Sequence, residues 1–156
     1  MTSPLPQWDE DYRPLLWGTF NGLAYVPRLP PTGYTLFLHL LTKQEPGGLV
    51  KATHGKLAEE LAIDRGLISR AMHHLVAARL VTSTSRGQCQ LHPQIAAFDN
   101  ARDQARAIKA LAPGERLDEG NFEDEYERRL EAHEQERLRK AEQRQRVTPL
   151  RPRLVR

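Results

Sequence analysis

Cationic and polar side chains share one side of a short predicted helix in the middle of the chain, where they could recognise a polyanion. At about 100° per residue, this side is centred on Gly66, Ser69, Arg70 and His73, with Arg65 at its flank. Arginine can bond bidentately to guanine, and serine can reach a base or a phosphate. A glycine allows the backbone to approach a partner closely. The pattern predicts a helix that reads base edges of duplex DNA.

Further residues could contact phosphates on either side of such a helix. Thr53, His54 and Lys56 begin the preceding predicted helix, where backbone N–H groups point outward and favour an anion. Arg86 lies in the segment Ser85-Arg86-Gly87, a predicted hairpin tip that reaches the adjacent backbone or minor groove. We therefore expect these four residues to position the protein on DNA.

The types and spacing of residues in this sequence give little indication of catalysis or of metal binding. The histidines do not show the i, i+4 spacing of a zinc-binding helix, and His73 and His74 are adjacent, so they point apart. The only cysteine, Cys89, falls on a predicted strand without an obvious base. Pro46-Gly47-Gly48 lacks the Lys-Ser/Thr of a phosphate-binding loop. We expect no enzymatic activity, no metal and no small-molecule cofactor.

Periodic apolar residues predict the elements that position these groups. A first helix buries one face at i, i+3, i+4, i+7, made of Tyr34, Phe37, Leu38 and Leu41. A turn at 46–48 and a short strand at 49–52 follow, and another short strand is predicted at 23–26.

Two capped helices and a hairpin come next. Thr53 is the predicted N-cap of the second helix, which buries Leu57, Ala58 and Leu61. Asp64 is the predicted N-cap of the third helix, which runs to about Arg79 and buries a face made of Ile68, Ala71, Met72 and Leu75. Strands at 80–84 and 88–91 then form a hairpin. This order is that of a winged helix-turn-helix, whose third helix enters the major groove.

The rest of the chain is divided by composition. Residues 1–32 are expected to pack on the domain as an N-terminal segment, and residues 33–112 to form the winged helix with a following helix at 94–112. Residues 113–156 are expected to form a charged tail, helical or disordered, with a thin apolar stripe of Phe122, Tyr126 and Leu130. The predicted fold class is mainly α with a small β-hairpin, α+β.

The helix-turn-helix residues carry a family resemblance. Residues 53–81 resemble the helix-turn-helix of MarR-type regulators, with Leu57-Ala58, Ser69-Arg70 and Leu80-Val81 at that pattern's usual places. Over about residues 15–100 the chain more closely resembles RepL-type plasmid replication proteins, in which a hairpin closes on Asn-Pro; here His92-Pro93 stands at that place. The resemblance implies sequence-specific DNA binding in plasmid or mobile-element replication, with transcriptional repression as the alternative.

Charge and composition agree with a partner that is a polyanion. Net charge is only +3, but residues 137–156 hold eight basic residues and one acid. These residues are expected to add sequence-independent attraction to double-stranded DNA. No apolar run is long enough to cross a membrane, and a lone cysteine suits the reducing cytoplasm. A homodimer is expected, with its contact supplied by the first helix and the 94–112 helix.

One rival function belongs to another class. Winged helices also bind proteins, and the Glu- and Arg-rich residues 115–146 could pair with a helix of a partner. An adaptor of this kind would keep its partner when Arg70 is substituted, whereas a DNA reader would lose its site.

Overall fold

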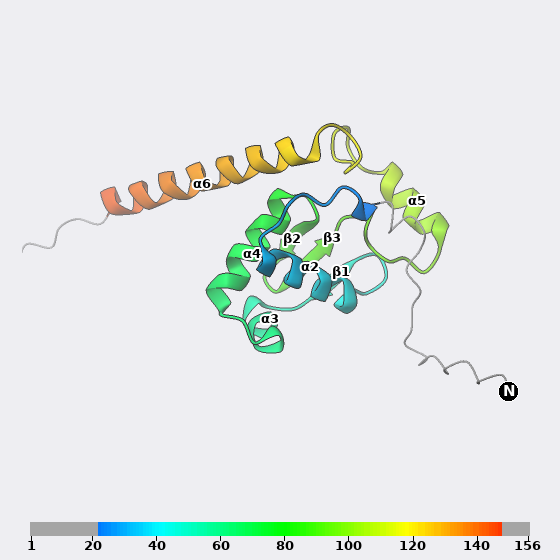
Figure 1. Cartoon of the computed structure of the whole chain (residues 1–156), viewed down its shortest axis with the longest axis horizontal. Coiled ribbons are helices and arrows are strands. Elements are labelled where there is room, and N and C mark those ends of the chain that lie inside the picture. Colours follow the sequence, from blue (N-terminus) through cyan, green and yellow to red (C-terminus); the bar gives the residue numbers. More distant parts are fainter. Residues whose placement is uncertain (1–21, 148–156) are drawn as a thin grey trace, which may run out of the picture.

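The computed structural model describes residues 22–147, in which five helices surround a small sheet (Figure 1). The sheet is antiparallel, with strand order β1-β3-β2. The elements in chain order are α2 (Pro31–Lys43), β1 (Leu49–Lys51), α3 (His54–Leu61), α4 (Arg65–Ala77), β2 (Val81–Ser85), β3 (Gln88–Leu91), α5 (Ala101–Lys109) and α6 (Phe122–Val147). The predicted class, mainly α with a small antiparallel sheet, is confirmed. The order from α2 to β3 is compatible with a winged helix.

The core lies between α2, α4 and the sheet. The predicted inner face of α4 is confirmed, since all four of its members are buried: Ile68, Ala71, Met72 and Leu75. Leu57 of α3 is fully buried as well, and strands β2 and β3 contribute Val81 and Leu91. Burial of this apolar surface holds α4 in place, and the side of α4 opposite to this core is left exposed.

Both predicted helix caps are confirmed. The Thr53 hydroxyl accepts a hydrogen bond from the Lys56 N–H at 3.2 Å, and α3 begins at the next residue. The Asp64 carboxylate accepts from the N–H groups of Gly66 and Leu67 at 2.8 and 3.3 Å. These bonds satisfy N–H groups that have no partner within the helix, so each cap fixes where its helix starts.

The buried face of the first helix differs from the prediction. Tyr34 and Leu38 are 40% and 60% exposed, whereas Leu36 and Leu40 of α2 are fully buried beside Phe37. Both sets of residues have helical spacing, so the pattern alone could not choose between them. Packing of α2 against α4 selects the set that includes Leu36 and Leu40.

Two predicted elements flanking the domain are also wrong. The expected strand at 23–26 is absent from the described residues, since Leu23 is helical and the following residues turn. The expected helix at 94–112 is helical only from Ala101 to Lys109. Its beginning is set by Asn100, whose side chain accepts from the Asp103 N–H at 2.9 Å. Ile95 instead lies fully buried in the turns after β3.

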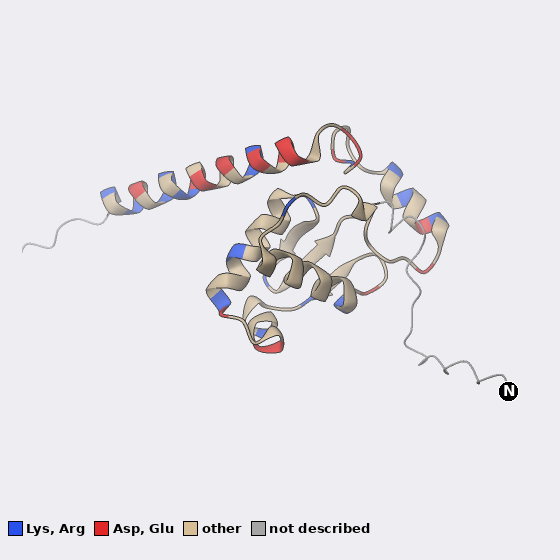
Figure 2. Cartoon of the chain, in the orientation of Figure 1, with Lys and Arg blue, Asp and Glu red and all other residues tan. Residues whose placement is uncertain are grey.

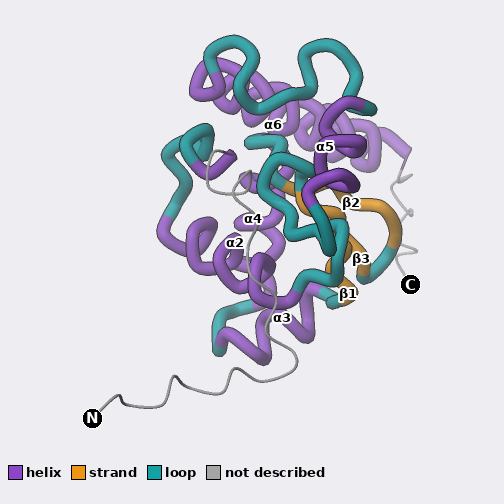
Figure 3. Tube along the Cα trace, turned by 90° about the vertical axis from the view of Figure 1, so that its right-hand side faces the viewer, coloured by secondary structure: helices purple, strands orange, loops and turns teal. Residues whose placement is uncertain are grey.

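The segment before α6 is tied to the domain. Arg79 donates hydrogen bonds to the carbonyls of Gly114 and Arg116 at 2.7 and 3.3 Å, although an arginine at the end of a predicted helix is usually a solvated charge. Leu117 is buried in the same core as α4, and Tyr126 on α6 is buried with it. Figures 1 and 3 both show α6 on the side of the domain opposite to α3. The first turns of α6 are therefore part of the packed structure.

Parts of the predicted segments lie outside the described residues, namely 1–21 of the N-terminal segment and 148–156 of the tail. Within residues 22–147, no helix is long and apolar enough to cross a membrane.

Candidate nucleic-acid interface

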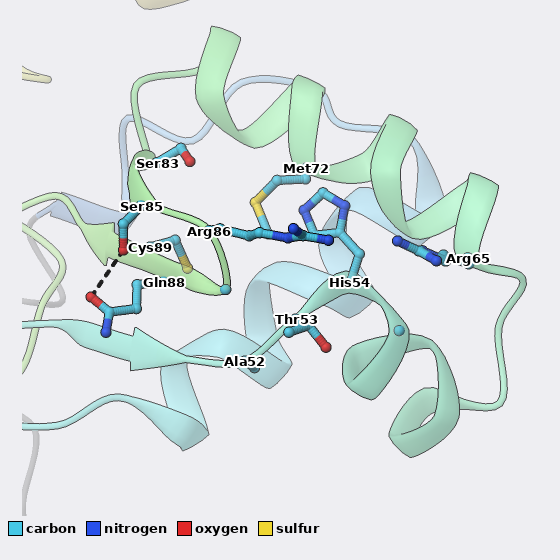
Figure 4. Close-up of a pocket in the computed structure, with 12 residues that line it drawn as sticks. Ala52, Thr53, His54, Arg65, Met72, Ser83, Ser85, Arg86, Gln88 and Cys89 are labelled. Carbon is cyan, nitrogen blue, oxygen red and sulfur yellow. Dashed lines mark hydrogen bonds between the residues drawn. The ribbon is translucent and has the colours of Figure 1, made fainter.

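An open hollow of about 450 Å³ lies between the start of α3, the α4 helix and the β2–β3 hairpin (Figure 4). Twelve residues line it: Ala52, Thr53, His54, Gly55, Arg65, Met72, Ser83, Ser85, Arg86, Gly87, Gln88 and Cys89. Four of the predicted contact residues, from three different elements, thus meet at one place. None of the twelve is acidic.

The basic side chains of the hollow converge. Arg86 extends from the hairpin tip into the hollow, and Arg65 borders the hollow from the start of α4 (Figure 4). Glu60 of α3 does not line the hollow; its carboxylate pairs with the ammonium group of Lys43 on α2 at 2.7 Å. Hydrogen bonds from Lys43 and then His39 lower the pKa of Glu60 to about 2. The residues that line the hollow thus include two arginines and no acid, and the Asp64 carboxylate beside Arg65 is held in the cap of α4.

The hairpin tip rests against the start of α3. Gly87 has φ +78°, a conformation that favours glycine. A Cβ at this position would lie 3.2 Å from the methyl carbon of Thr53. The close approach of Gly87 to Thr53 holds Arg86 over the hollow.

His54 and Ser69 join α3 to α4 at the edge of the hollow. Their Nδ1 and Oγ atoms lie 3.0 Å apart. Burial lowers the pKa of His54, and the charges of Arg65 and His73 lower it further. His54 is therefore neutral at pH 7 in the free protein. A phosphate placed nearby would favour the protonated form instead.

The outward side of α4 carries the remaining predicted residues. Gly66, Arg70 and His73 are all exposed. The Arg70 Nε donates to the Gly66 carbonyl at 3.4 Å, and a Cβ on Gly66 would lie 2.9 Å from the Asp64 carboxylate oxygen. Glycine thus leaves this cap uncrowded. Arg70 and His73 do not line the hollow; they face α6 across a second cleft.

Lys56 stands apart from both cavities. Its side chain is exposed on α3 and lines neither the hollow nor the cleft, although its N–H is held by the Thr53 cap.

Sequence reasoning missed two features of this surface. Leu67, in the first turn of α4, is 40% exposed, and an exposed apolar side chain there suits contact with a thymine methyl group. The sequence holds no signal that would single it out. The second feature is the position of α6 beside α4, for which the spacing of Tyr126, Leu130 and His133 was an available signal.

Cys89 lies at the hollow but is buried, and burial raises the pKa of its thiol. The thiol is therefore protonated at neutral pH and contributes packing. Among residues 22–147, His, Cys, Asp and Glu side chains form no group of three that could hold a metal ion.

This surface thus consists of the outward face of α4, a basic hollow at one edge of that face, and a cleft between that face and α6. No protein-family model, curated protein or solved structure matches this chain.

Proposed function

We propose that this chain binds double-stranded DNA sequence-specifically, with α4 in the major groove. The observation that carries the proposal is the hollow, which Arg65, Arg86 and His54 line from three elements and which no acidic residue lines. A protein surface with this charge favours phosphate, and an exposed α-helix of this size fits the major groove of B-form DNA.

The contacts divide into two kinds. Gly66, Arg70 and His73 are the candidates for base edges, because they are exposed on the outward side of α4. Residues at the hollow are the candidates for phosphate, with Arg86 reaching the neighbouring backbone or minor groove. Lys56 and Thr53, at the start of α3, add contacts to the same phosphate strand.

The biological role we propose is initiation or control of plasmid or mobile-element replication. The likeness of residues 15–100 to RepL-type proteins favours it, and the likeness of residues 53–81 to MarR-type regulators favours the second candidate, a transcriptional repressor. We further propose a homodimer on a symmetric site. The exposed outer face of α2, with Tyr34 and Leu38, is the apolar surface available for that contact.

Genome-scale affinity selection of DNA fragments with the purified chain tests the proposal. An Arg70→Ala variant is run beside it, with Arg102→Ala on the distant helix α5 as the matched control. One repeated motif that is recovered with the wild type and the control, and lost with Arg70→Ala, supports α4 as the reading helix. A motif at a replication origin supports the replication role, and one at a promoter supports repression. Recovery of no motif, together with binding that Arg70→Ala leaves unchanged, would leave the adaptor function as the better account.

A further inference from the structure

The helix α6 leaves the domain along α4. Tyr126 is buried and its hydroxyl hydrogen-bonds to the Nδ1 of His74 at 2.7 Å. Leu130, one turn further on, packs against the core. The His133 ring then stacks on the His73 ring, with centroids 6.2 Å apart. One stripe of α6 therefore follows the outward side of α4.

The same stripe becomes cationic where it passes beyond the core. Arg137 and Lys140 continue it at helical spacing, and both line an open cleft of about 860 Å³ between α6 and α4. Arg70 and His73 line the opposite wall. In Figure 2 the Lys and Arg residues of α4 and the distal half of α6 lie toward the same side of the molecule. Cations from two helices thus face one cleft.

Two acids also lie on the α6 wall, and each is paired within its own helix. Glu134 accepts from Arg137 at 2.7 Å, and Glu136 pairs with Lys140 at 2.5 Å. All four of these side chains are more than half exposed. Exposed ion pairs contribute little and are exchanged easily, so a phosphate can replace either carboxylate as the partner.

The hollow and the cleft flank the outward side of α4, and the cleft extends onto that side, because Arg70 and His73 line its α4 wall. Arg65 faces the hollow, and His74, about 180° away around the helix, faces the cleft. A helix in the major groove has a sugar-phosphate strand on each side of it. We propose that the α4–α6 cleft receives the strand opposite to the hairpin, with Arg137 and Lys140 as its phosphate contacts. This inference rests on the proposed function.

Salt dependence of DNA binding by the full chain tests this arrangement. The variant Arg137→Gln/Lys140→Gln removes the two cleft cations. Its matched control, Arg139→Gln/Arg146→Gln, removes two cations from the opposite side of α6. Each phosphate contact adds about 0.9 to the negative slope of log affinity against log salt, so the cleft variant should flatten the slope by about 1.8. The control should change it less, and neither variant should alter the base preference.

Two further measurements locate the contact. Within each half-site, ethylation of individual phosphates should interfere with wild-type binding on both strands, and the cleft variant should lose the interference on one of the two strands. Glu134→Gln, which frees Arg137 and removes a negative charge from the cleft, should tighten binding.

Three results would overturn the inference. Equal flattening by the cleft variant and its control would mean that α6 attracts DNA without a defined contact. Tighter binding by the cleft variant would mean that α6 obstructs α4. A changed oligomeric state at unchanged salt slope would mean that the cleft holds a second copy of the chain. In each case the wild type would still bind its motif in an Arg70-dependent way, whereas loss of that binding is what would contradict the proposed function itself.

Discussion

The imidazole rings of His73 on α4 and His133 on α6 lie stacked, with centroids 6.2 Å apart and ring planes inclined by 16°. His73 belongs to the face predicted to read DNA, and His133 to the segment predicted to be a charged tail. The contact joins two parts of the chain that composition separates. The contact places α6 against the face of α4 for which we propose DNA recognition.

Removal of the Tyr126 side chain should destabilise the whole domain. Tyr126→Ala should lower the free energy of unfolding by roughly 3–5 kcal/mol, because it leaves a cavity against α4. Tyr126→Phe should cost about 0.5–1.5 kcal/mol, since it loses only the hydrogen bond to His74. Urea denaturation measures both. Leu138→Ala, at an exposed position of the same helix, is the control, and an equal loss there would contradict the account.

Arg79 should stabilise the segment that leads to α6. Arg79→Ala removes the hydrogen bonds to the Gly114 and Arg116 carbonyls and should cost roughly 1.5–3 kcal/mol. Arg79 has φ +61°, so Arg79→Gly, which relieves that conformation, should be more stable than Arg79→Ala by about 1 kcal/mol. Thermal denaturation and hydrogen exchange of residues 112–121 provide the measurement. Unchanged exchange in that segment would show that Arg79 does not hold it.

Stability should fall in mild acid because His92 is held neutral. Its Nδ1 accepts from the Gln94 N–H and its Nε2 donates to the Glu115 carbonyl, so a second ring proton has no acceptor. Burial lowers the pKa of His92 below its ordinary value of 6.5. Below about pH 6.5 the unfolded chain therefore binds more protons than the folded one, and the free energy of unfolding decreases as the pH falls further.

Urea denaturation between pH 8 and pH 5 measures this effect. His92→Gln should reduce the dependence on pH, while His133→Gln, at an exposed position, should leave it as in the wild type. If the free energy of unfolding depended on pH in the same way in His92→Gln as in the wild type, His92 would not be the source of that dependence.

DNA affinity should rise as the pH falls, because His54 should take up a proton when a phosphate binds beside it. Burial, Arg65 and His73 lower the pKa of His54 in the free protein, and a bound phosphate would raise it. Binding then takes up a proton, so affinity increases as the pH falls through the pKa of the complex. Fluorescence anisotropy between pH 8 and pH 6 should show a weaker pH dependence for His54→Gln than for the wild type. Identical pH profiles would exclude His54 as a phosphate contact.

The sequence was enough to predict a structural feature where the interactions that determine the feature are local. Thr53 and Asp64 cap the helices that follow them, and each bond spans no more than three residues. The inner face of α4 could also be predicted, because four of its apolar residues, Ile68, Ala71, Met72 and Leu75, share one helical phase. In α2 the apolar residues fit two phases, and only contact with α4 decides that Leu36 is buried and Leu38 exposed.

Only part of the candidate site could be predicted, because only part of it is set by local interactions and by the order of the elements. The convergence of Arg65, His54 and Arg86 on one hollow follows from the order of helices and hairpin. The hydrogen-bond partners of Arg79 lie 35 and 37 residues further along the sequence, and no periodic pattern predicts a contact over such a separation. The apposition of α6 and α4 is likewise a tertiary contact: the spacing of Tyr126, Leu130 and His133 indicates a packed face on α6, but not that α4 is its partner.

The central claim, that α4 reads base sequence, is tested most directly by equilibrium binding of one selected duplex and a scrambled duplex of the same length. Wild type, Arg70→Ala and the α5 control Arg102→Ala are compared at near-physiological salt. The account predicts that Arg70→Ala loses roughly 1–3 kcal/mol of binding free energy on the selected duplex and none on the scrambled duplex. The control Arg102→Ala should bind both duplexes as the wild type does. An equal loss on both duplexes, or none on either, would contradict it.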